Sequence, residues 1–268
     1  MVLKDEAYNM FLEKALYPCV RVKTEKAGGS GTVIWSTERD GTFVLTCEHV
    51  IDSAIQIKEE WSPVLQRNVK RDVRAPVWVE FFKYSYKDRA VGGETIEAEI
   101  IAYDKNEDIA VLRLKDDTVR KYVAEIQDDP SELKYFDEVI TVGAALGHPP
   151  IATVGNICGF NDLIDNRDYM LCTAPSIFGN SGGATFLTKN WKLIGMPARI
   201  SVILAGFSAD PITHMGYIVP FWRIRKFFED QMLYFLLGHD ISYEECMKKI
   251  EERRKLSELE IALEELKK

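Results

Sequence analysis

Between residues 19 and 220, the hydrophobic positions fall in short runs that alternate with polar positions or end at glycine-containing turns. Residues 19–23 alternate most clearly, as expected for a strand with one buried face. Residues 32–35 and 42–46 flank a turn that ends at Gly41, a pattern typical of a β-hairpin. We therefore expect an all-β core, with later strands near residues 77–82, 95–101, 109–114, 138–143, 152–157, 169–173, 183–187, 191–195 and 216–220.

Both ends of the chain instead have apolar residues at helical spacing. Residues 1–18 predict a short N-terminal helix that packs on the body or binds a partner. Residues 221–238 predict a closing helix, because Pro220 suits the start of a helix and Gly238 suits its end. Residues 239–268 predict a helical tail whose helix begins near residue 242.

The tail carries Glu–Lys pairs four residues apart and a stripe of leucines. The stripe is Leu256, Leu259, Leu263 and Leu266, and its 3-4-3 spacing is that of a coiled-coil seam shorter than two full heptads. An isolated helix of this length is marginal in water, so the stripe should be buried. It either docks on the body or pairs with another subunit in a homo-oligomer.

The segment from residue 51 to residue 100 is long for a connection between two barrel strands. A basic cluster, Arg67, Lys70, Arg71 and Arg74, precedes the run at 77–82. This cluster favours a solvated loop. The alternative is an inserted hairpin that borders a substrate cleft.

Composition and charge exclude several classes of protein. The 268 residues are 46% hydrophobic and 28% charged, as in ordinary globular proteins. A net charge of −8 argues against broad nucleic-acid binding, which needs a basic face. No stretch is long and apolar enough to span a bilayer, so we expect no membrane association, and the acidic N-terminus does not resemble a signal peptide.

The cysteines and histidines give no sign of a disulfide framework or a metal centre. Five cysteines, an odd number without tight spacing, favour a reduced setting, and we expect a cytoplasmic protein. The four histidines are scattered without metal-ligand spacing. We therefore expect no metal site and no cofactor.

The chemistry centres on a glycine-rich string at residues 178–183, Phe-Gly-Asn-Ser-Gly-Gly. Gly179, Gly182 and Gly183 permit backbone angles closed to other residues and let a substrate approach closely. Such a loop suits a nucleophilic Ser181 and can aim the N–H groups of Gly179 and Ser181 at one point. Taken alone, the string is also compatible with an ordinary turn.

Two upstream strings accompany this loop in the chain order His, Asp, Ser. His49 stands at the end of a predicted strand, and Asp108 opens the apolar run that follows it. The three strings together resemble the trypsin/chymotrypsin-like serine peptidases, most closely their HtrA-like branch. The resemblance implies a body over residues 19–220 made of two six-stranded β-barrels, at about 19–118 and 119–220. We expect no PDZ domain, which many members of this branch carry, because no segment after the body is large enough.

By this resemblance the chain is a serine endopeptidase that cleaves a protein or peptide substrate through an acyl-enzyme intermediate. Ser181 would be the nucleophile, His49 the general base and Asp108 the residue that orients the imidazole. The N–H groups of Gly179 and Ser181 would form the oxyanion hole. The resemblance implies a single chain that is either active as it stands or gated by loops, rather than one activated by release of a new N-terminus.

Other interpretations stay open. The chain could be a protease dedicated to itself or to one partner, or a non-catalytic binding scaffold on the same fold. Glu107 and Asp104 are rivals to Asp108 by chemistry alone.

The resemblance also implies a pocket for the side chain that precedes the cut. No acid stands near its expected base, although Arg199 follows one wall. We therefore expect small or medium apolar side chains to be preferred over Arg and Lys. The expected pocket residues are Pro175, Ser176, Ile177, Met196, Pro197 and Ala198.

Overall fold

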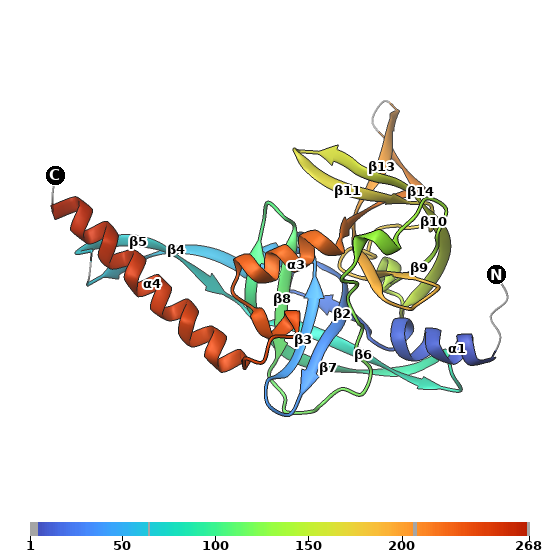
Figure 1. The fold of residues 1–268 in the computed structure, drawn as a ribbon, viewed down its shortest axis with the longest axis horizontal. Coiled ribbons are helices and arrows are strands. Elements are labelled where there is room, and N and C mark those ends of the chain that lie inside the picture. Colours follow the sequence, from blue (N-terminus) through green and yellow to red (C-terminus); the bar gives the residue numbers. More distant parts are fainter. Residues whose placement is uncertain (1–4, 64, 206–207, 267–268) are drawn as a thin grey trace.

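The computed structural model describes residues 5–63, 65–205 and 208–266, and its strands close into two antiparallel barrels (Figure 1). Barrel 1 has the strand order β1-β2-β3-β8-β7-β6. The alternation of buried and exposed residues predicted for β1 is observed, because Val20 and Val22 are fully buried while Arg21 and Lys23 are not. Its strands are β1 (Cys19–Lys23), β2 (Gly28–Thr37), β3 (Gly41–Thr46), β6 (Val77–Ser85), β7 (Arg89–Asp104) and β8 (Ile109–Leu114).

Barrel 2 has the strand order β10-β11-β14-β13-β12-β9. The predicted double six-stranded barrel is therefore confirmed, and residues 115–137 connect the two halves. A short helical turn, η3 (Pro130–Glu132), lies in that connection, and η4 (Ala145–Gly147) follows β9. The strands are β9 (Glu138–Gly143), β10 (Ile151–Ile164), β11 (Arg167–Cys172), β12 (Ala184–Leu187), β13 (Leu193–Ala205) and β14 (Ser208–Pro220).

The N-terminal helix is confirmed as α1 (Asp5–Phe11), which continues into one wider turn, η1 (Leu12–Leu16). Phe11, Leu12 and Leu16 are buried, and the Phe11 ring lies 6.1 Å from the ring of Trp191. This helix therefore packs on the body, as one of the two predicted roles requires.

The predicted closing helix is wrong in its length. A single helix over 221–238 was expected, but α3 (Phe221–Asp230) ends at Asp230 and a separate turn, η5 (Tyr234–Leu237), follows. Met232 adopts a left-handed backbone with φ of 59°, which breaks the helix. The break lets Leu233 and Phe235 point into the core, where both are fully buried.

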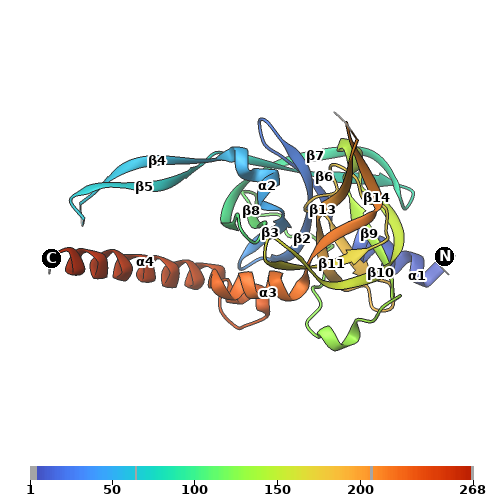
Figure 2. The same ribbon diagram turned by 90° about the horizontal axis from the view of Figure 1, so that it is seen from above.

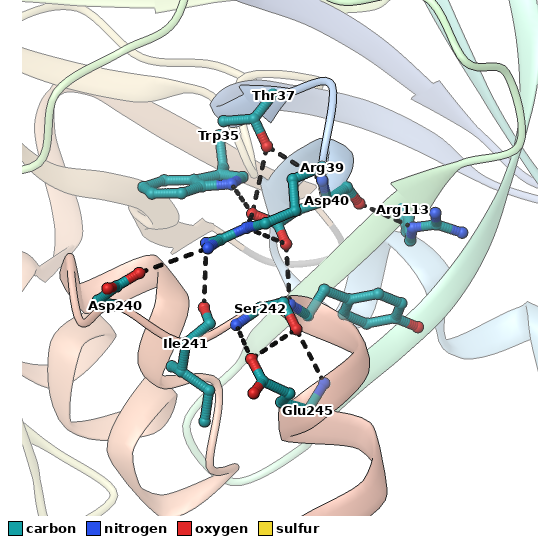
Figure 3. A network of polar contacts seen from close by, with 10 residues as sticks. Trp35, Thr37, Arg39, Asp40, Arg113, Asp240, Ile241, Ser242 and Glu245 are labelled. Atoms are coloured by element: carbon teal, nitrogen blue, oxygen red, sulfur yellow. Dashed lines mark hydrogen bonds and ion pairs between the residues drawn. The ribbon is translucent and has the colours of Figure 1, made fainter.

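The tail forms α4 (Tyr243–Leu266), which is anchored to barrel 1 at its first residue (Figure 3). The buried carboxylate of Asp40 accepts a hydrogen bond from the backbone N–H of Tyr243 (2.9 Å). The same carboxylate accepts from the side chains of Trp35, Thr37 and Arg39, each at 3.2 Å. A buried acid therefore fixes where the helix starts.

The start of α4 is also capped within its own sequence (Figure 3). The Ser242 hydroxyl accepts from the N–H of Glu245 (3.2 Å), and the Glu245 carboxylate accepts from the N–H of Ser242 (2.8 Å). This reciprocal pair satisfies two donors that a helix start otherwise leaves open. The next turn packs on the body through the fully buried Cys246.

Residues 55–74 form a hairpin, so the solvated loop favoured by the basic cluster is wrong and the alternative of an inserted hairpin holds. β4 (Ile55–Ser62) and β5 (Arg67–Arg74) pair with each other as a two-stranded sheet. The hairpin and the far half of α4 project from the barrels to the same side (Figure 2). We call β4, β5 and residues 251–266 the arm.

None of the five cysteines is in a disulfide, and the described helices include none with the length and apolar character needed to cross a membrane. Two short turns complete the fold, α2 (Glu48–Ile51) and η2 (Asp52–Ala54), and they connect β3 to the arm.

Candidate active site

His49 and Asp108 lie at the ends of two neighbouring strands. β3 pairs with β8 so that Thr46 is opposite Ala110, which brings the residues after β3 close to those before β8. The His49 Nδ1 lies 2.9 Å from both carboxylate oxygens of Asp108. The backbone N–H of His49 also donates to Asp108 (3.1 Å). The carboxylate therefore fixes both the position and the orientation of the imidazole.

Asp108 itself is held in an unusual backbone conformation. Its φ is 56°, a left-handed angle that costs a non-glycine residue on the order of 1 kcal/mol. The preceding turn is closed by Asp104, whose carboxylate accepts from the N–H groups of Asn106 (2.7 Å) and Glu107 (3.0 Å). Asp104 is thus a turn-forming residue, and Asp108 is the acid that reaches His49.

Glu107, the other rival acid, is clamped by two arginines from the second half of the chain. The Arg223 guanidinium on α3 donates to the Glu107 carboxylate (2.8 Å) and to the Glu107 carbonyl (3.1 Å). Arg167 on β11 donates to the other carboxylate oxygen (3.3 Å). Arg223 is buried and its Cζ lies 4.8 Å from the ring centre of Tyr169. The residue just before Asp108 is therefore tied to barrel 2 and α3.

The loop that carries Ser181 is fixed through its carbonyl groups. The Phe178 carbonyl accepts from the N–H of Leu146 (2.8 Å), and the Asn180 carbonyl accepts from the N–H of Gly183 (2.9 Å). In a trans peptide the C=O and N–H groups point in opposite directions. The N–H groups of Gly179 and Ser181, which share these two peptides, consequently point away from Leu146 and Gly183.

Ser30 of β2 ties this loop to barrel 1. Its hydroxyl donates to the Gly179 carbonyl (2.6 Å), and its N–H donates to the Ser181 carbonyl (2.8 Å). The sequence patterns gave no indication of this role for Ser30. The local feature at this position is a lone serine within a run of glycines.

Gly179 is required at its position by both space and conformation. Its φ is +96°, and a Cβ there would lie 2.6 Å from the backbone N of Leu146. Gly182 is similar, because its φ is +85° and a Cβ on it would lie 2.2 Å from the carbonyl oxygen of Ser30. No side chain fits at either position without moving the backbone.

His49 and Ser181 line the same cavity, which has a volume of about 260 Å³. Burial of the His49 ring disfavours the imidazolium, but the hydrogen bond to Asp108 and the charges of Asp108, Glu48 and Asp52 outweigh it. The pKa of His49 is therefore raised above its usual value of 6.5. The other residues that line the cavity are Ser176, Ile177, Phe178, Pro197, Ala198, Arg199 and Ile200.

Of the six expected pocket residues, Ser176, Ile177, Pro197 and Ala198 line this cavity, whereas Pro175 and Met196 do not. Met196 is fully buried in the core, and Pro175 is exposed. No residue of the β4–β5 hairpin lines the cavity, among the residues that the structure describes. A larger hollow of about 370 Å³ on barrel 1 contains neither His49 nor Ser181.

Arg199 is the one charged residue, besides His49, among the described residues that line the cavity. Its guanidinium pairs with Asp165 (2.7 Å) and lies over the ring of Tyr169, 5.4 Å from the ring centre. The cavity thus offers apolar walls and an ion-paired guanidinium to a substrate side chain.

Cys47 is the third group beside His49 and Asp108, with the donor atoms of all three within 4.8 Å of one another. Metal binding needs a thiolate. Burial, with the charge of Asp108 nearby, raises the pKa of Cys47 well above its usual value, and its thiol donates to the carbonyl of Pro197 (3.3 Å). The arrangement suits a His–Asp pair better than a metal centre.

The comparisons with known proteins agree with this geometry. The family model described as "Trypsin-like peptidase domain" matches residues 29–196, more than half of the chain. A curated relative, "Serine protease Do-like HtrA" of Bacillus subtilis (strain 168), is 26% identical over 207 residues. That match covers 74% of this chain but 37% of the relative, so the chain spans little more than a third of the relative's length. The chain belongs to the trypsin-like peptidase family.

Proposed function

We propose that the protein is a serine endopeptidase whose catalytic residues are His49, Asp108 and Ser181. The observation that carries this proposal is that Ser181 and a His49 oriented by Asp108 line one cavity. A serine hydroxyl is a weak nucleophile near neutral pH and needs a base that is itself oriented.

The chemistry follows from these positions. His49 takes the proton of the Ser181 hydroxyl as the oxygen attacks the scissile carbonyl, and then gives it to the leaving amine. Asp108, bonded to Nδ1, keeps the other ring nitrogen free for this exchange and stabilises the imidazolium. Water then hydrolyses the acyl-enzyme by the same proton transfers.

The N–H groups of Gly179 and Ser181 form the oxyanion hole of this proposal. Their peptides are turned by the bonds that Leu146 and Gly183 make to the carbonyls on the opposite side. Loss of one such donor typically costs about 3 kcal/mol of transition-state stabilisation. The left-handed glycines therefore contribute to catalysis through backbone geometry.

The side chain before the cut occupies the space beside Ile177, Pro197 and Ala198. The apolar walls favour small or medium apolar side chains over Lys and Arg. A substrate cation would lose its hydration without gaining an acidic partner, because Asp165 is already paired with Arg199 and no acid is among the described residues that line the cavity.

Hydrolysis of an internally quenched peptide library tests the proposal. We expect Ser181→Ala to lower kcat by about a million-fold, the scale of losing a triad nucleophile, with folding intact. Ser176→Ala is the matched control, since this serine lines the same cavity. A Ser176→Ala variant that loses cleavage while Ser181→Ala retains it would refute the assignment of the nucleophile.

A further inference from the structure

The far half of α4 exposes three leucines of the stripe. Leu256, Leu259 and Leu263 are 61%, 50% and 56% exposed, and the side chain of Leu266 lies outside the described residues. Scattered exposed leucines are ordinary on a surface. These three are not scattered, because their spacing places them on one face of one helix.

The direction of this face follows from the contact that α4 makes with the hairpin. Glu258 points at β5, where its carboxylate lies 3.1 Å from the guanidinium of Arg71. Successive helix residues are rotated by about 100°. Leu259, Leu256 and Leu263 therefore lie about 100°, about 160° and about 140° round the helix from Glu258. The stripe faces away from the hairpin.

The angular positions around the helix also show that the stripe faces away from the barrels. The residues through which α4 packs on the body are Cys246, Met247 and Ile250. They lie between about 240° and about 340° from Glu258, on the other half of the helix. The stripe therefore cannot dock on the body without turning the helix out of its anchored position.

We propose that the leucine stripe is a docking surface for the same stripe of a second copy of this chain, with the two α4 helices parallel. The spacing of Leu256, Leu259 and Leu263 is that of the a and d positions of a two-helix seam. Because the stripe lies opposite the body-packing face, two helices can meet there with their barrels on the outside.

The charges beside the stripe select the parallel arrangement. Lys255 flanks it on one side and Glu260 on the other. In a parallel pair, Lys255 of each copy faces Glu260 of the second copy, which gives two favourable pairs. In an antiparallel pair, the flank that carries Lys255 faces the same flank of the second copy, so Lys255 does not face Glu260 and both favourable pairs are lost.

The anchor at the start of α4 prepares this surface. Asp40 and the Ser242–Glu245 cap hold the first turn (Figure 3), so the helix is already formed and directed before association. Preorganisation of this kind lowers the entropic cost of binding. Leu256 lies 13 residues beyond Tyr243, about 20 Å along the helix, which leaves room for both bodies.

Sedimentation of the full chain at about 50 µM, within the micromolar-to-millimolar range of weak contacts, tests the proposal. We expect a mass near twice 30.6 kDa for the wild type and near 30.6 kDa for Leu259→Lys. Ile261→Lys is the matched control. Ile261 is 41% exposed on the same helix, but it lies on the face that carries Glu258 and not on the face of the leucine stripe. The variant should stay dimeric.

Charge exchange tests the parallel register. Lys255→Glu and Glu260→Lys should each weaken the dimer, and the double variant should restore it. A wild type that is monomeric at this concentration, or an Ile261→Lys variant as monomeric as Leu259→Lys, would overturn the proposal. A double variant no better than the singles would overturn the parallel pairing.

Discussion

The active-site cleft, which holds His49, Asp108 and Ser181, and the arm differ in how their residues are held. In the cleft, Asp108 is fixed through its own contacts with His49 and through the clamp on Glu107, and the Ser181 loop is bonded to both barrels. In the arm, the far half of α4 reaches the hairpin through the Arg71–Glu258 pair, while its leucines are open to solvent.

This difference teaches where the chain uses its long-range contacts. The cleft must hold three segments from distant parts of the sequence in one geometry, because small displacements of catalytic groups are costly. The helix that enters the arm, α4, is anchored by Asp40 at its first residue and has leucines open to solvent at its far end. Changes in the cleft should therefore affect catalysis, and changes in the arm should affect association or stability.

The largest effect after loss of the nucleophile should come from Asp108→Asn. We expect kcat/KM to fall by about 10,000-fold, because the imidazole loses its orienting carboxylate. The rising limb of the pH profile reports the protonation of His49, whose base form is required. Since Asp108 raises the pKa of His49, the limb should move to lower pH in the variant. An unchanged limb would show that this carboxylate does not control the titrating base.

Arg223→Gln tests whether the clamp on Glu107 positions Asp108. We expect kcat/KM to fall by about 10- to 100-fold as the preceding peptide loosens. The rising limb of the pH profile should again shift to lower pH, which a loss of stability alone would not produce.

Lys226→Gln is the control for Arg223→Gln, since Lys226 is an exposed residue of α3 that pairs with Asp230. Glu107→Gln should reproduce the shift, and the double variant should be no worse than the more severe single variant. If the melting temperature falls while the rising limb of the pH profile stays in place, Arg223 contributes to stability alone.

The preferred side chain before the cut tests the description of the cavity. For peptides identical except before the cut, Val, Ala or Leu should give a kcat/KM about tenfold or more above that of Lys or Arg. Arg199→Ala should narrow the difference, because it removes a guanidinium from the cavity and leaves the Asp165 carboxylate without this partner. Cleavage sites dominated by Lys or Arg would contradict the placement of the pocket.

Changes at the anchored start of α4 should mainly affect stability. Burial raises the pKa of Asp40, but the bonds from Tyr243, Trp35 and Arg39 and the charge of Arg39 outweigh it, so this pKa is below its usual 3.8. The stability it contributes is present above this usual value and is lost as the pH falls through the lower folded pKa.

Asp40→Asn should therefore lower the free energy of unfolding at pH 7 by about 1–3 kcal/mol and leave kcat of the folded protein unchanged. The difference from wild type, measured by denaturant unfolding, should shrink below about pH 4. Glu38→Gln, an exposed neighbour in the same turn, is the control. Equal stability of Asp40→Asn and wild type at pH 7 would contradict the anchoring role.

The sequence predicted the barrels because each buried strand face leaves an alternating pattern, as in β1. It favoured a loop over the hairpin of β4 and β5, since a two-stranded sheet open to solvent on both sides needs no apolar alternation, and β5 carries the basic cluster. It also missed the break after Asp230, because Phe227, Phe228, Met232 and Leu236 keep helical spacing across it.

The candidate site was predicted only in part for a similar reason. His49, Asp108 and Ser181 stand in local strings that can be read from one sequence. The partners that hold them, Ser30 and Arg223, are far away in the chain, and nothing local to either position indicates which backbone it will reach. Only the closed barrels and the packed α3 bring them together.

The most direct test of the central claim is labelling of the purified full chain with a fluorophosphonate, followed by peptide mapping. This reagent reports an activated serine without requiring knowledge of the substrate. We expect the label on Ser181 of the wild type, much slower labelling of Asp108→Asn and no labelling of Ser181→Ala. A label of equal intensity on Ser181→Ala, or a label mapped to another serine, would contradict the account.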